Sequence, residues 1–180
     1  MLNLNETKFR VNSFVFYPGY GVCIVESVSV QKIGSAELSF YNIRVLENSA
    51  KIMVPVKNAT EVGLRLLIKE NEIQKVFDVL EEKCIKSPFA RKESWNKRFN
   101  GYNLKLCSAC LFEVAEVLRD LYILKLEKEL SFAEKKMFEK AKHLIIKEIS
   151  TVMNRPETFV EEKIKSIFIQ KSEQPSNQMH

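Results

Sequence analysis

The spacing of apolar residues along the chain changes once, near residue 60. Before that point, short runs rich in β-branched and aromatic residues alternate with turn residues, which is typical of antiparallel strands. The runs cover residues 14–17, 22–30, 40–46 and 52–56. Glycine, proline and asparagine between the runs favour chain reversals. This pattern predicts a small antiparallel β-barrel, whose exposed edge strands suit docking to a protein strand better than binding a small molecule.

After about residue 66 the apolar spacing becomes helical. A first helix is marked by a stripe of four apolar residues, Ile73, Val76, Phe77 and Leu80. Ser87 and Pro88 suit the cap and the first position of a second helix. That second helix carries Trp95 and is predicted to end near Asn100-Gly101, with a further helical stretch through residues 104–106.

Three more helices are expected in the second half of the chain. The apolar spacing predicts one from Leu111 to about Lys128. Ser131 and Glu134 have the spacing of a capping box, which opens a helix to Met153. A last helix covers about residues 159–169. The sequence thus predicts an α+β chain with a β-barrel domain at 1–66, an all-α domain at 67–170 and a disordered tail at 171–180.

Composition narrows the class of protein without naming a function. Hydrophobic residues make up 46% of the 180-residue chain and charged residues 28%, as in ordinary folded soluble proteins. No apolar run approaches the roughly 18 residues that a membrane span needs, and the N-terminus lacks a secretory pattern. We therefore expect a cytoplasmic protein with reduced cysteines.

The single tryptophan, Trp95, lies in a strongly basic stretch. Residues 83–105 contain seven Lys or Arg residues and one acid, in a chain whose net charge is only +5. Residues three and four apart share a helix face, so Arg91, Lys92 and Arg98 are expected beside Trp95. An aromatic ring among basic side chains suits a nucleic-acid backbone and an unstacked base step. Burial of Trp95 in the core, with the charges on a solvated face, is the alternative that these residues leave open.

Motifs for catalysis are missing from the sequence, which contains no Walker A, GxGxxG, GxSxG or HExxH pattern. Cys107 and Cys110 form a CxxC motif, typical of a redox pair or half of a zinc site. A structural zinc needs four ligands. The other cysteines and histidines form no second pair: Cys23, Cys84, His143 and His180. We therefore expect Cys107 and Cys110 to be small apolar fillers, and expect no enzyme activity, metal or cofactor.

Five stretches, taken in order, resemble the CarD/CdnL family of bacterial transcription regulators. A YP-x-x-G strand opening and a Trp-x-x-Arg-aromatic segment are the most recognisable. The stretches are Phe16–Val22, Met53–Val56 with Val62–Arg65, Trp95–Phe99, Val114–Leu121 and Leu130–Lys135. Each is weak alone, but all five stand in the family's order and spacing over about residues 8–153.

The resemblance implies an N-terminal Tudor-like (SH3-like) domain that binds the β subunit of RNA polymerase. This domain would share its fold with the polymerase-binding domain of transcription-repair coupling factor. A C-terminal helical domain would contact promoter DNA at the upstream edge of the bubble, where Trp95 would wedge into the minor groove and stabilise the open complex. Lys97 and Arg98, with Arg91 and Lys92, would hold phosphates. The protein would be a nucleoid-associated monomer.

The sequence departs from the family in two places. Gln31 and Met53 stand where some members carry arginines thought to touch polymerase, and Lys32 and Lys51 nearby are expected to take that role. Ser108-Ala109-Cys110 replaces the Ser-Gly-Asp that many members have before the third helix, so the cap there is expected to be moved or weakened.

Two other functions fit parts of the sequence. One is a polymerase-docking adaptor whose helical domain meets another protein, with Trp95 buried. The other is a thiol redox protein that uses Cys107 and Cys110.

Overall fold

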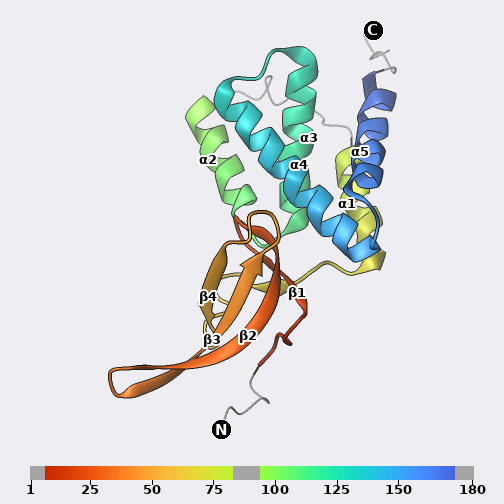
Figure 1. Cartoon of the computed structure of the whole chain (residues 1–180). Helices are drawn as coiled ribbons and strands as arrows, with labels where there is room; N and C mark the ends of the chain where they lie inside the picture. Colours follow the sequence, from red (N-terminus) through yellow and green to blue (C-terminus); the bar gives the residue numbers. More distant parts are fainter. Residues whose placement is uncertain (1–6, 83–93, 173–180) are drawn as a thin grey trace. The chain divides into compact units, whose positions relative to one another are not determined.

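The structure is a computed structural model that describes residues 7–82 and 94–172. The chain divides into two compact units, Met1–Leu67 and Ile68–His180. The first contains the strands and the second the helices (Figure 1). Ser87 and Pro88, which we predicted to open a helix, lie outside the described residues, as does the predicted tail from residue 173 onward.

The described residues of the first unit form a five-stranded antiparallel sheet. Its strands are β1 (Phe14–Tyr17), β2 (Gly21–Ile33), β3 (Ala36–Val45), β4 (Lys51–Pro55) and β5 (Arg65–Leu66), in the order β4-β3-β2-β1-β5. β2 and β3 are joined by a two-residue turn at Gly34-Ser35, where Gly34 adopts a φ of 64° that favours glycine. The β2–β3 hairpin extends beyond the end of β4, whose pairing stops at Phe40 (Figure 1).

One face of this sheet carries the core of the unit. Phe9 covers the core, with its ring edge against Tyr41 and its backbone N–H donating to the Tyr41 hydroxyl at 3.2 Å. Ala59 and Leu64 of the segment between β4 and β5 also belong to the core, and the strands supply its other apolar side chains at alternate positions, as the period of a strand requires. They are Val15, Cys23, Val25, Tyr41, Ile43, Val45 and Val54. Burial raises the pKa of the Cys23 thiol to about 12.

The predicted strands are present, but the closed barrel is not confirmed. β4 and β5 stand at the two ends of the strand order, and no hydrogen-bonded ladder joins them in the described part of the chain. β5 contains only two residues and pairs with β1. The sheet is therefore open, because closure would require the strands at its two ends to pair with each other.

In its described residues, the second unit contains one short 3₁₀ turn and five helices. These are η2 (Glu70–Glu72), α1 (Ile73–Glu81), α2 (Trp95–Leu106), α3 (Leu111–Glu127), α4 (Phe132–Met153) and α5 (Glu157–Ser172). α3 packs against α1, α2 and α4 and buries more than half of its residues. α4 packs against α5 as well, and α5 against α1. None of the described helices is both long and apolar enough to cross a membrane.

The helix ends confirm some predictions and correct one. The apolar stripe predicted for α1 is buried, and Ser131 and Glu134 form the expected capping box at the start of α4. α2, however, does not end at Asn100-Gly101, since it continues to Leu106. A glycine costs a helix only about 1 kcal/mol relative to alanine, and the burial of Tyr102 and Leu106 beyond it outweighs that cost.

Candidate nucleic-acid interface

Trp95 is the first residue of α2, directly after the cap residue Ser94. The Ser94 hydroxyl accepts a hydrogen bond from the backbone N–H of Lys97 at 3.4 Å. The Trp95 indole is 43% exposed and stacks on Phe99 one turn later, with ring centroids 4.8 Å apart and ring planes 19° apart. The chain therefore holds the indole in place without burying it.

The two basic residues that follow Trp95 differ in exposure. Lys97 is exposed. The Arg98 side chain is only 12% exposed, and its Nη2 lies 4.0 Å from Oε1 of Glu134 on α4. Arg98 thus links α2 to α4 in this structure, and its contact with a phosphate stays a prediction. Arg91 and Lys92 lie outside the described residues.

Glu134 is a buried carboxylate with partners on several sides. The Ser131 hydroxyl and backbone N–H donate to it at 2.7 and 2.9 Å, and Lys128 Nζ lies at 3.6 Å. Burial on its own would raise the pKa of Glu134, but the hydrogen bonds from Ser131 and the charge of Lys128 outweigh it and lower that pKa. The carboxylate is therefore ionised at neutral pH, where it attracts Arg98.

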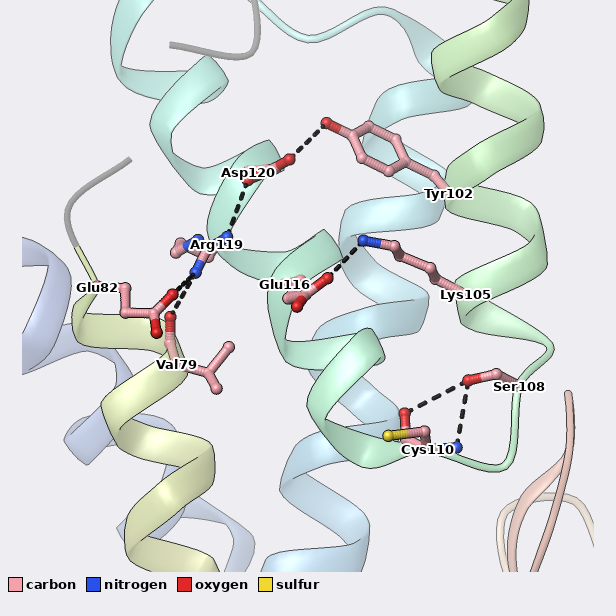
Figure 2. Close-up of polar contacts among 9 residues, drawn as sticks. All are labelled: Val79, Glu82, Tyr102, Lys105, Ser108, Cys110, Glu116, Arg119 and Asp120. Atoms are coloured by element: carbon pink, nitrogen blue, oxygen red, sulfur yellow. Dashed lines mark hydrogen bonds and ion pairs between the residues drawn. The ribbon is translucent and has the colours of Figure 1, made fainter. Parts of the chain in front are cut away.

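Both apolar and polar contacts attach α2 to the rest of its unit. Tyr102 and Leu106 are its only buried residues among those described. The Tyr102 hydroxyl donates to Oδ2 of Asp120 on α3 at 3.2 Å, and Lys105 pairs with Glu116 of the same helix (Figure 2). Asp120 is only 4% exposed, so its contact with Tyr102 is buried.

The spacing of residues along α2 indicates how this helix is attached to its neighbours. Arg98, Tyr102 and Leu106 are spaced four apart, so they share one face of α2. Polar residues on the face that also carries a core leucine indicate buried polar contacts. Their partners Glu134 and Asp120 lie on other helices. A single sequence does not show which residues of different helices contact one another.

In the first unit, the structure brings Gln31 and Met53 together. Gln31 Nε2 lies 3.8 Å from Met53 Sδ, and both side chains are exposed. Side chains alternate along a strand, so this face lies opposite the core residue Val54. Lys51, two residues before Met53, is on the same face and its side chain is 78% exposed. Lys32 is exposed as well, and alternation places it on the other face.

Models of known protein families match both units. The CarD-like/TRCF RID domain matches residues 9–68, and the CarD C-terminal domain matches residues 75–165. The chain belongs to the CarD-like family. A similar protein from Bacillus subtilis (strain 168), described as "Putative transcription factor YdeB", is 28% identical over 163 residues, covering 88% of this chain and 98% of that protein.

Membership of the CarD-like family confirms the resemblance found in the sequence. It assigns the chain to transcription regulation and, through its RID domain, to interaction with RNA polymerase. The RID match contains the exposed Gln31, Met53 and Lys51, and the CarD C-terminal match contains Trp95.

The CarD C-terminal match also contains the CxxC motif. Cys107 is the C-terminal cap of α2 and Cys110 the N-terminal cap of α3, and both are free and exposed. The expectation that they are buried fillers was wrong, because they fall in the turn between the two helices. The Ser108 hydroxyl accepts from the Cys110 N–H at 3.2 Å, and α3 has no side-chain cap. Within the described ranges, no group of three or more His, Cys, Asp or Glu residues is placed to hold a metal ion.

Proposed function

We propose that this chain regulates transcription initiation without enzymatic activity, by binding the β subunit of RNA polymerase and promoter DNA at the upstream edge of the bubble. The observation that supports DNA binding is the exposure of the Trp95 indole. A large aromatic ring at the start of a helix is 43% exposed and is supported by stacking on Phe99. Such a ring is ready to contact a partner, because large aromatic side chains are buried on average.

The surroundings of Trp95 suit a nucleic-acid backbone. The first turn of α2 contains no acidic residue, so the positive end of the helix dipole is not offset there. Lys97 is exposed in the same turn and would hold a phosphate. Trp95 would insert at an unstacked base step of the minor groove and oppose reclosure of the bubble. Arg91 and Lys92 would add phosphate contacts.

Polymerase binding is proposed from the exposed edge and face of the open sheet. β4 is an end strand of the sheet, and no other described strand pairs with its outer edge, so a strand of a partner can join it there. Beside that edge, Met53 and Gln31 give an apolar and polar patch, and Lys51 gives a positive charge. We propose that this face binds the polymerase β subunit, and that Lys32, which follows Gln31 on β2 and lies on the other face, adds a second positive charge.

The lifetime of the open complex on one promoter, measured with and without the full chain, tests this function. We expect the chain to lengthen the lifetime. A variant carrying Lys51→Glu and Met53→Glu should lose that effect while keeping its DNA affinity, because it alters only the proposed polymerase face. A lifetime that the wild-type chain leaves unchanged would contradict the proposal. DNA affinity with no dependence on salt would favour the adaptor instead.

A further inference from the structure

A continuous set of polar contacts runs from the end of α1 through α3 to α2 (Figure 2). Arg119 Nη1 donates to the backbone oxygen of Val79 at 3.0 Å and to Oε2 of Glu82 at 2.7 Å. Arg119 Nη2 lies 3.6 Å from Oδ1 of Asp120. The other oxygen of Asp120 accepts from the Tyr102 hydroxyl at 3.2 Å. One oxygen of Asp120 thus pairs with Arg119, and the other accepts the hydrogen bond that links α3 to α2.

Three members of this set are buried, since Tyr102, Asp120 and Arg119 are 7%, 4% and 9% exposed, whereas the Glu82 side chain is 66% exposed. Buried ion pairs contribute little net stability, because desolvation offsets their attraction, and apolar residues of similar size often serve as well. Hydrogen bonds differ from apolar contacts in being directional. The set is therefore better suited to fixing an orientation than to stabilising the fold.

The orientation that it fixes is that of α2. The first residue of α2 that is buried as a whole is Tyr102; in the half of the helix that begins with Trp95, the contact with another helix is that of the Arg98 side chain with Glu134 at 4.0 Å. Tyr102 follows Trp95 by seven residues, about two turns, so the two side chains leave the helix in nearly the same direction. Any rotation of α2 at Tyr102 would turn Trp95 by the same angle.

We propose that Tyr102 and Asp120 are positioning residues for Trp95, and that Arg119 fixes Asp120 through their ion pair. They set the angle at which α2 presents the indole to DNA. This inference rests on the function proposed for Trp95 above.

Tyr102→Phe in the full chain tests the proposal, since it removes one hydroxyl and keeps the ring. Tyr122→Phe is the matched control, because among the described residues no hydrogen bond is found for the Tyr122 hydroxyl, while its ring stacks on Phe168. We expect Tyr102→Phe to shorten the open-complex lifetime by about 2- to 10-fold, the range that one hydrogen bond gives in an equilibrium constant. Tyr122→Phe should leave it unchanged. Equal lifetimes for Tyr102→Phe and wild type would overturn the proposal.

The same change in a Trp95→Ala background separates positioning from general weakening of the fold. We expect Tyr102→Phe to have no further effect there, because the side chain that it positions is gone. An equal effect in both backgrounds would overturn the proposal.

Fluorescence of Trp95 gives a readout that does not depend on transcription. As the only tryptophan in the chain, Trp95 reports its own mobility. We expect lower anisotropy in Tyr102→Phe than in wild type or Tyr122→Phe. If Trp95→Ala leaves the open-complex lifetime unchanged, the wedge function fails, and anisotropy alone decides the positioning: a decrease supports it and an unchanged value overturns it.

Discussion

Trp95 keeps 43% of its surface exposed while it stacks on Phe99. Trp95→Ala should therefore lower the free energy of unfolding by only about 1 kcal/mol, from the lost stacking and a surface change. The measurement is a chemical-denaturation curve. Phe168→Ala is the control, because Phe168 is 1% exposed and its removal should cost about 3–5 kcal/mol. A loss for Trp95→Ala as large as that of the control would contradict the exposed position of the indole.

Lys97 carries the next prediction, on DNA affinity. Lys97→Gln should weaken binding to all DNA sequences alike and lower the slope of log affinity against log salt by about one, since one phosphate contact is lost. Titrations of labelled promoter DNA at several salt concentrations measure both. Lys140→Gln, at an exposed lysine in the middle of α4, removes the same charge and should leave the slope unchanged. Equal slopes for wild type and Lys97→Gln would remove Lys97 from the interface.

Among single residues, the local sequence was a better guide to the exposure of Trp95 than to that of Arg98, and the contact of either residue with DNA stays a prediction. The only tryptophan within a basic stretch is a local signal, and the structure leaves it exposed. Arg98 belongs to the same stretch, yet its side chain is 12% exposed because Glu134, 36 positions away, lies beside it. Local charge cannot reveal a partner that distant in the sequence.

α2 contains a glycine for which the described part of its unit gives no structural reason. A Cβ added at Gly101 would meet nothing within 4 Å. Gly101→Ala should therefore raise the free energy of unfolding by about 0.5–1 kcal/mol, because alanine loses less backbone entropy in a helix. Chemical denaturation measures the change. A loss of stability would show that the helix is not regular at residue 101.

Glu134 links α2 to the start of α4, and its lowered pKa gives this link a pH dependence. A folded-state pKa below the unfolded value contributes stability above the unfolded pKa and loses it as the pH falls through the folded pKa. Glu134→Gln should thus cost about 1–3 kcal/mol at pH 7, and this difference from wild type should shrink as the pH falls below 4.5.

Denaturation curves from pH 7 to pH 3 measure this difference. Glu139→Gln, at an exposed glutamate of the same helix, is the control and should show little effect at any pH. A wild-type advantage over Glu134→Gln that stays constant down to pH 3 would contradict the lowered pKa.

The sequence predicted single helices and strands better than the contacts between them. The stripe of α1 and the capping box of α4 depend on spacing within one helix, so periodicity finds them. The extension of α2 past Gly101 depends on packing against α3, and the open sheet depends on which strands pair at its ends. Such long-range contacts have no periodic signal in one sequence.

In the whole molecule, each of the two matched domains has one of the two proposed binding functions. The RID domain carries an exposed face around Met53 for polymerase, and the CarD C-terminal domain carries Trp95 for DNA. On this account, loss of the indole should spare polymerase binding and most of the salt-dependent DNA affinity, because both depend on other residues.

The lifetime of the open complex with the Trp95→Ala chain therefore tests the central claim most directly. The lifetime is measured on one promoter beside wild type and beside polymerase alone, at protein concentrations that saturate polymerase. We predict a lifetime close to that of polymerase alone, although the variant is folded and bound. A folded Trp95→Ala chain that keeps the wild-type lifetime would contradict the account.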